Sequence, residues 1–255
     1  MKNHGVKKMK IMLDAGHGMN TAGKRTPDNS MREFEYNNVV AQIAKNLFLE
    51  YEGVQIDFAH DPLGERDVPL FTRVQKANRW PADIYISIHA NASGNDWSNA
   101  VGIETFHYIA ASESSKKLAA AVQKKLIEKT NRRDRGVKQA DFQVIRETKM
   151  SAILVEGGFM TNREEAELLK TNSYRLLCAE AIVEAVVELY RLKKKQVTVA
   201  NVSININNDV ADNWASDAWK WANEMFFLDG TNPKTNVTRQ ELAVVLKRVV
   251  EYLQK

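Results

Sequence analysis

Residues 10–18 read KIMLDAGHG, an apolar β-type run that ends in a polar, glycine-rich turn. Four further runs of the same kind follow along the chain, at Val54–Ala59, Ile84–Ile88, Gly102–Ile109 and Ala152–Val155. Amphipathic segments with helical spacing separate these runs. Short strands that alternate with helices are typical of an α/β domain. We therefore expect a mostly parallel, twisted sheet flanked by helices.

Composition places the chain among globular proteins. It has 255 residues and a net charge of +4, with 44% hydrophobic and 27% charged residues. These values exclude fibrous, collagen-like and low-complexity proteins. The apolar runs are far shorter than the roughly 20 residues that a membrane span needs. The apolar stretch after the basic start is too short for a signal peptide, so we expect synthesis in the cytoplasm without one. The mild charge, without a basic stripe, predicts no nucleic-acid partner.

The sequence pattern changes near residue 193. Residues 1–8 form a basic tail, and residues 9–193 carry the strand and helix pattern of the main domain. Residues 194–210 are rich in Val, Ile, Asn and Ser without a helical period, which indicates a linker. Residues 211–255 hold two helical patterns around a break at Asp229, Gly230 and Pro233. We expect a small helical module there.

Cys178 is the single cysteine of the chain. It excludes an intramolecular disulfide and a zinc site built mainly from thiolates. Because Cys178 lies within an apolar helical pattern, we expect a buried structural thiol.

Three side chains with catalytic potential lie at the ends of strand-like runs. His17, His89 and Glu156 each follow such a run. The carboxyl ends of parallel strands share one sheet edge, so we expect these side chains to converge. Taken singly, each histidine is more often a loop or packing residue than a ligand. A carboxylate after a buried strand needs a charge partner or a catalytic task, and a metal ion would supply that partner.

A zinc site with two histidines needs a further ligand, and Glu33 and Glu35 are the candidates. Catalytic zinc commonly takes three protein ligands and keeps one position open. At about 100° per residue, Glu33 projects onto the apolar stripe of its helix, whereas Glu35 projects onto the polar face. This direction assumes a helix that already runs at residue 33, which Asn29 or Ser30 as the N-cap would permit. Alternatively, Glu33 is a helix-start carboxylate stabilised by the helix dipole.

Six motifs follow one another between about residues 8 and 192. They are Asp14-Ala15-Gly16-His17-Gly18, Glu33 with Asn37, Leu70-x-x-Arg73-x-x-x-Ala77-Asn78, Ser87-Ile88-His89-Ala90-Asn91-Ala92, Arg135-Gly136-Val137 and Leu154-Val155-Glu156-Gly157-Gly158-Phe159-Met160-Thr161-Asn162. In this order they resemble the signatures of the zinc-dependent N-acetylmuramoyl-L-alanine amidases of the autolysin and phage-endolysin type. A His-Gly motif alone is weakly specific, whereas six motifs in order are strongly specific.

The resemblance implies a role for each matching residue. His17, Glu33 and His89 would bind one zinc ion, and Glu156 would be the catalytic acid–base. Asn91 and Arg73 match motif positions too, and they either contact substrate or hold loops and strands. Gly157 departs from the pattern, because a larger apolar residue is expected after the catalytic Glu. We expect this departure to alter packing rather than chemistry.

The C-terminal segment carries a second resemblance. Trp214, Trp221 and the turn at residues 230–233 make residues 211–255 similar to one S-layer-homology unit. The resemblance implies binding to secondary cell-wall polymers, although such units generally occur in several copies. Self-association into a homo-oligomer through the tryptophan face is the alternative.

The leading functional hypothesis is therefore a zinc amidase that cleaves peptidoglycan between N-acetylmuramic acid and L-alanine. We expect a phage endolysin that acts on the wall after its release, and a bacterial autolysin stays open. Two further hypotheses are a zinc aminoacylase or peptidase acting on soluble substrates, and a non-catalytic wall-binding protein.

Overall fold

The structure is a computed structural model that describes residues 8–196. The chain divides into two units, Met1–Lys195 and Gln196–Lys255. The predicted tail, most of the predicted linker and the module at 211–255 lie outside the described residues. The predictions of wall-polymer binding and self-association through that module lie there as well.

The described residues contain one six-stranded sheet in the order β2-β1-β3-β6-β4-β5. Its strands are β1 (Met9–Ala15), β2 (Val54–Phe58), β3 (Ile84–Asn91), β4 (Ile103–Tyr108), β5 (Asp134–Ala140) and β6 (Ser151–Phe159). The first four strands in this order run parallel, β4 pairs antiparallel with β6, and β5 pairs parallel with β4. The expected mostly parallel sheet is confirmed.

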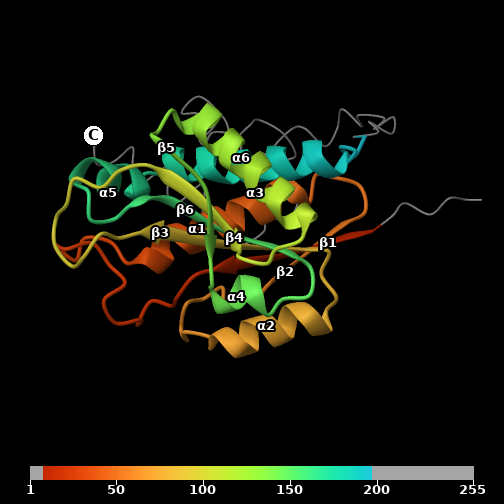
Figure 1. The fold of residues 1–255 in the computed structure, drawn as a ribbon, viewed down its shortest axis with the longest axis horizontal. Coiled ribbons are helices and arrows are strands. Elements are labelled where there is room, and N and C mark those ends of the chain that lie inside the picture. Colours follow the sequence, from red (N-terminus) through yellow and green to blue (C-terminus); the bar gives the residue numbers. More distant parts are fainter. Residues whose placement is uncertain (1–7, 197–255) are drawn as a thin grey trace, which may run out of the picture. The chain divides into compact units, whose positions relative to one another are not determined.

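Helices cover both faces of the sheet (Figure 1). One face carries α1 (Glu33–Phe48), α3 (Glu113–Thr130) and α6 (Asn172–Tyr190), and the other carries α2 (Leu70–Arg79) and α4 (Gln143–Arg146). The short α5 (Arg163–Lys170) follows β6. This double cover explains the apolar strands, because strands buried on both faces read as continuous hydrophobic runs. Within residues 8–196, no helix is long and apolar enough to cross a bilayer.

Strand alternation separates the side chains of the two faces. Ile84, Ile86 and Ile88 pack in the large core under α1, α3 and α6, whereas Tyr85 packs in the smaller core under α2 and α4. His89 therefore lies on the α2 and α4 face, because side chains two residues apart share a face. Glu156 pairs with His89 in the β3–β6 register, which puts both side chains on the same face near the carboxyl ends of their strands.

Two elements depart from the predicted pattern. We did not predict β5, a polar edge strand without buried residues, because it lacks the apolar alternation that marks a strand. We also placed His89 and Glu156 after their strands, and this was wrong: β3 and β6 continue to Asn91 and Phe159. The polar side chains interrupt the apolar pattern, but the backbone pairing continues past them.

Cys178 lies in α6, where its side chain is buried in the large core. Burial raises the pKa of its thiol to about 12. The prediction of a buried thiol is confirmed, and the thiol is inert at neutral pH because the thiolate is the reactive form.

Candidate active site

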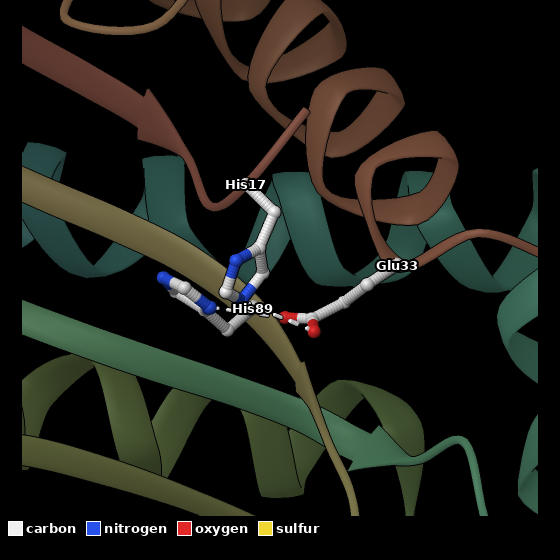
Figure 2. A group of neighbouring side chains, drawn as sticks. All are labelled: His17, Glu33 and His89. Carbon is white, nitrogen blue, oxygen red and sulfur yellow. Dashed lines mark hydrogen bonds and ion pairs between the residues drawn. The ribbon is translucent and has the colours of Figure 1, made fainter. Parts of the chain in front are cut away.

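His17, Glu33 and His89 converge from three separate elements (Figure 2). His17 lies in the turn after β1, Glu33 is the first residue of α1, and His89 lies on β3. One potential ligand atom from each lies within 4.8 Å of the other two. The carboxylate of Glu33 lies between the rings, with Oε2 at 3.3 Å from His17 Nε2 and Oε1 at 3.0 Å from His89 Nδ1.

Glu33 and Glu35 have different tasks in the structure. Glu33 is buried, whereas the Glu35 carboxylate accepts a hydrogen bond from the backbone N–H of Arg32 and so caps the helix. The N-cap is Arg32, so the expected cap at Asn29 or Ser30 was wrong. The Glu33 N–H donates to the Lys24 carbonyl at 3.0 Å, which keeps the chain in an extended pairing up to the start of the helix. Glu33 still faces inward, as its helical projection predicts.

The Glu33 carboxyl is ionised despite its burial. Burial alone raises its pKa, but hydrogen bonds and charge from His17 and His89 outweigh this effect, so the pKa lies below its ordinary value. Its Oε1 also accepts the N–H of Ala90 at 3.2 Å and the side-chain amide of Asn37 at 3.3 Å. A buried anion that is fixed in this way is suited to hold a cation.

Arg73 holds the turn that carries His17. The backbone of His17 is left-handed, with φ of 66°, which is uncommon for a residue with a side chain. The guanidinium of Arg73 is 1% exposed and uses all five N–H donors within the protein. The acceptors are the carbonyls of Ala15, His17 and Val68 and the carboxylates of Asp14 and Asp67. The sequence left two roles open for Arg73, substrate contact and loop holding. These hydrogen bonds fit loop holding.

Glu156 is the second carboxylate of the site. It lines a cavity of about 420 Å³ together with His17, His89 and Lys24. Its Oε2 is buried and has no hydrogen-bond partner among the described residues. Burial, with the charges of Glu33 and Glu104, raises the pKa of Glu156 well above its ordinary value, and Lys24 opposes this effect. Glu156 is thus a second buried carboxyl close to the ligand cluster, and its surroundings favour the protonated form.

Asn91 belongs to a polar network on the neighbouring strands. Its Nδ2 donates to Glu104 Oε1 at 2.7 Å, and its Oδ1 accepts the N–H of Ala92 at 2.8 Å. Glu104 also accepts hydrogen bonds from Arg135 and Lys138. These contacts fit a strand-holding role for Asn91. We did not single out Glu104, although a charged residue inside a predicted strand, with the Arg135 motif elsewhere in the chain, was an available signal.

The cavity continues from the ligand cluster along the α2 and α4 face. Its walls include Leu70 at the start of α2 and Phe142 before α4, which are 50% and 40% exposed. Exposed apolar side chains that rim a cavity are typical of a binding groove. We did not predict Phe142 as a wall residue, because α4 itself was not predicted.

Two glycines permit close packing at the site. A Cβ atom at Gly16 would lie 2.0 Å from the His89 ring, so only glycine fits beneath this imidazole. A Cβ atom at Gly157 would lie 1.9 Å from the hydroxyl oxygen of Tyr36 on α1. The phenol of Tyr36 therefore occupies the space of the larger residue expected at position 157, and the departure from the motif affects packing, as expected.

The donor set suits a zinc ion. Two imidazole nitrogens and one carboxylate oxygen form one of the ligand sets of catalytic zinc sites, which keep a further position open. The three ligand atoms are close enough to share one ion, and Glu156 remains outside the set with an unpartnered oxygen. The residues present therefore fit the metal.

Comparisons with known proteins identify relatives of this chain. Residues 11–188 match the family model described as N-acetylmuramoyl-L-alanine amidase. The endolysin of Bacillus phage SPP1 is 34% identical over 72% of this chain and 67% of its own length. The N-acetylmuramoyl-L-alanine amidase CwlM of Bacillus licheniformis is 30% identical over 77% of this chain and 74% of its own length.

A solved structure shows the same fold. The N-acetylmuramoyl-L-alanine amidase from Clostridium difficile 630 superposes with a TM-score of 0.69 at 31% identity, covering 73% of this chain and 98% of that chain. The family match spans most of β1, all of β2 to β6 and the positions of His17, Glu33, His89 and Glu156. The chain therefore belongs to the N-acetylmuramoyl-L-alanine amidase family.

Proposed function

We propose that this peptidoglycan amidase is a zinc enzyme that cleaves the amide bond between N-acetylmuramic acid and L-alanine. His17, Glu33 and His89 would hold one zinc ion, and Glu156 would transfer protons. The observation that carries this proposal is the unpartnered, buried oxygen of Glu156, a residue that lines the same cavity as His17 and His89 of the three-ligand cluster.

Glu156 would act first as a base and then as an acid. When bound, zinc supplies Lewis-acid polarisation of the amide carbonyl and lowers the pKa of the attacking water to about 7. Glu156 accepts a proton from this water as the new C–O bond forms. It then donates the proton to the alanine nitrogen as the C–N bond breaks. The products are the lactyl carboxylate of the sugar and a free L-alanine amine.

The electrostatics support different tasks for the two buried carboxyls. The imidazoles lower the pKa of Glu33, which favours the ionised form that a cation needs. Burial and the neighbouring carboxylates raise the pKa of Glu156, which makes its carboxylate a stronger proton acceptor. Two carboxyls whose surroundings push their pKa values apart are a common basis for acid–base assignment.

We infer that Asn91 and Arg73 position the site rather than bind substrate. The hydrogen bonds within the protein occupy both ends of the Asn91 amide and every donor of Arg73. Substrate contact would require these bonds to break. The exposed walls at Leu70 and Phe142 are better placed to receive substrate.

Product analysis tests the proposed reaction. The full-length protein is incubated with purified peptidoglycan while its zinc content is measured. We expect one zinc per chain, new L-alanine amino ends, no new reducing sugars, loss of activity after chelation and recovery with added zinc. New reducing ends, amino ends other than L-alanine or full activity in a chelator would contradict the proposal. Hydrolysis of soluble acyl-amino acids in preference to walls would favour the aminoacylase hypothesis.

We further propose that the chain acts as an endolysin, which the similarity to the SPP1 phage endolysin supports. Such an enzyme degrades the wall once the membrane barrier has been removed. The test is expression in a Gram-positive host followed by permeabilisation of the membrane with nisin. We expect rapid lysis after permeabilisation, whereas a culture that lyses no faster than one expressing Glu156→Gln would contradict this role.

A further inference from the structure

A chain of buried polar side chains lies directly behind His89. Ser87 Oγ donates to Asp14 Oδ2 at 2.8 Å, and the same Ser87 oxygen lies 3.2 Å from His89 Nε2. The other oxygen of Asp14 accepts from Arg73 Nη1 at 2.6 Å. Ser87, Asp14 and Arg73 are each at most 1% exposed. Burying these groups costs free energy, so a continuous hydrogen-bonded chain needs a reason.

The direction of each hydrogen bond follows from the buried charge. Arg73 cannot lose its proton in a protein, so the Asp14 carboxylate beside it only accepts hydrogen bonds. The single proton of the Ser87 hydroxyl is therefore committed to Asp14. Toward His89, the Ser87 oxygen presents lone pairs, and so His89 Nε2 carries a proton and donates it to that oxygen. Its Nδ1 faces Glu33 Oε1 at 3.0 Å and, without a metal ion, donates a hydrogen bond to this ionised carboxylate. A bound metal ion would take the place of the Nδ1 proton and receive the lone pair.

We propose that Ser87, oriented by Asp14, is a positioning residue that fixes the tautomer and the rotation of His89 so that its Nδ1 lone pair faces the metal site. This inference rests on the proposed zinc site. Metal-binding histidines depend on the partner of their second nitrogen, and loss of such a partner typically weakens metal binding roughly 10- to 100-fold. Gly16 closes the other side of the ring, because its missing Cβ is what leaves room for the imidazole.

Arg73 also supports the second histidine, His17, through its backbone. Arg73 donates to the carbonyl of His17 at 2.7 Å and so holds the left-handed turn that directs this ring toward Glu33. Asp14 and Arg73 therefore connect the supports of both histidines, one through Ser87 and the other through the main chain.

Ser87→Ala tests the proposal with the full-length protein. Long-range proton–nitrogen NMR spectra of histidine-labelled protein, zinc-stripped and zinc-loaded, report which ring nitrogen is protonated. In the zinc-stripped wild type at about pH 8, above the ordinary histidine pKa of roughly 6.5, we expect a proton on His89 Nε2 in addition to the Nδ1 proton that Glu33 accepts. In Ser87→Ala we expect the Nε2 proton to be lost under these conditions, and a dissociation constant for zinc, measured by chelator competition, that is roughly 10- to 100-fold higher.

Asp14→Asn makes a sharper test because it reverses the direction of the hydrogen bonds that join residue 14, Ser87 and His89. The carbonyl oxygen of the new side-chain amide must face Arg73, so the amide NH₂ group donates to Ser87. The Ser87 hydroxyl is then free to donate to His89 Nε2, and we expect the Nδ1–H tautomer with weakened zinc binding. A purely structural role for Asp14 would not remove the proton from Nε2. If this variant does not fold, Ser87→Ala still decides the proposal.

Thr105→Val is the matched control. It removes another buried strand hydroxyl, which donates to Gln123 at 2.8 Å on the opposite face of the sheet. We expect wild-type His89 tautomer and zinc affinity. The proposal is overturned if the zinc-stripped wild type carries no proton on His89 Nε2, or if Ser87→Ala keeps both the Nε2 proton and wild-type zinc affinity. If the wild type binds no zinc, the zinc proposal fails while the tautomer of His89 still decides this one.

Discussion

The two faces of the sheet carry different side chains near the carboxyl ends of the strands: apolar on one face and polar on the other. Under α1, α3 and α6 the strands present isoleucine, leucine and valine up to their carboxyl ends. Under α2 and α4 the same strands change from Met12 and Tyr85 to Asp14, Ser87, His89 and Glu156. The comparison shows that the apolar face stabilises the sheet, which lets the other face hold buried polar groups that cost stability.

The largest expected effect is that of Glu156→Gln on the polar face. Removing the proton-transfer group should lower amidase activity by roughly 10²- to 10⁴-fold, because this is the usual contribution of general acid–base catalysis. Zinc content should stay at the wild-type value, because Glu156 lies outside the ligand cluster. Release of L-alanine amino ends measures the activity, and metal analysis measures the zinc. Activity within about tenfold of wild type would refute the assignment of Glu156.

Ile86→Ala makes the corresponding change on the apolar face. Ile86 is fully buried in the large core, and truncation should lower the free energy of unfolding by about 2–5 kcal/mol. The measurement is urea denaturation of the full-length protein, and the exposed Leu63→Ala is the control. We expect activity per folded molecule to stay within a few-fold of wild type. A loss of activity as large as that of Glu156→Gln would contradict the separation of the two faces.

His60 makes stability depend on pH. Burial lowers its pKa to about 4, with Asp14 acting in the opposite direction. Its Nδ1 accepts the N–H of Ala15 at 2.9 Å, which requires the neutral ring. The unfolded chain binds the proton near pH 6.5 and the folded chain only near pH 4. The contribution of neutral His60 to the free energy of unfolding is therefore fully present above about pH 6.5. Roughly 3 kcal/mol of it is lost as the pH falls to about 4.

Unfolding measured between about pH 7.5 and 4 checks this dependence, with His60→Gln as the comparison. The variant should be less stable than the wild type at the upper end of this range and should show a flatter decline with falling pH. A wild-type slope in His60→Gln would show that another group is responsible.

Gly157→Ala should have the smallest effect of the four. The added methyl group meets the Tyr36 hydroxyl, and overpacking of this kind costs about 1–3 kcal/mol of unfolding free energy. Combining it with Tyr36→Leu should recover part of that loss, because the phenol is removed from the contact. Thermal denaturation of both single variants and the double variant measures the coupling. Strictly additive losses would indicate that the two residues do not compete for one space.

Particular residues show which parts of the fold and of the site the sequence could predict. The apolar runs predicted five of the strands, and helical spacing predicted that Glu33 rather than Glu35 faces inward. The polar strand β5 and the wall residue Phe142 were missed, because an edge strand and a one-turn helix bury too little to leave an apolar pattern. The cap of α1 was misplaced because the chain is held by a backbone pairing at Arg32 that no local motif signals.

Residue order alone determined the alternation of strands and helices, because periodicity is a local property. It also placed His17, His89 and Glu156 near one edge of the sheet, because the carboxyl ends of parallel strands share an edge. Only the tertiary structure decided how the buried polar groups are paired. Asp14 and Ser87 are 73 residues apart in the chain, and no local pattern gives the direction of the hydrogen bond between them. That direction depends on the guanidinium of Arg73 from a third element, because buried charges act through space rather than along the chain.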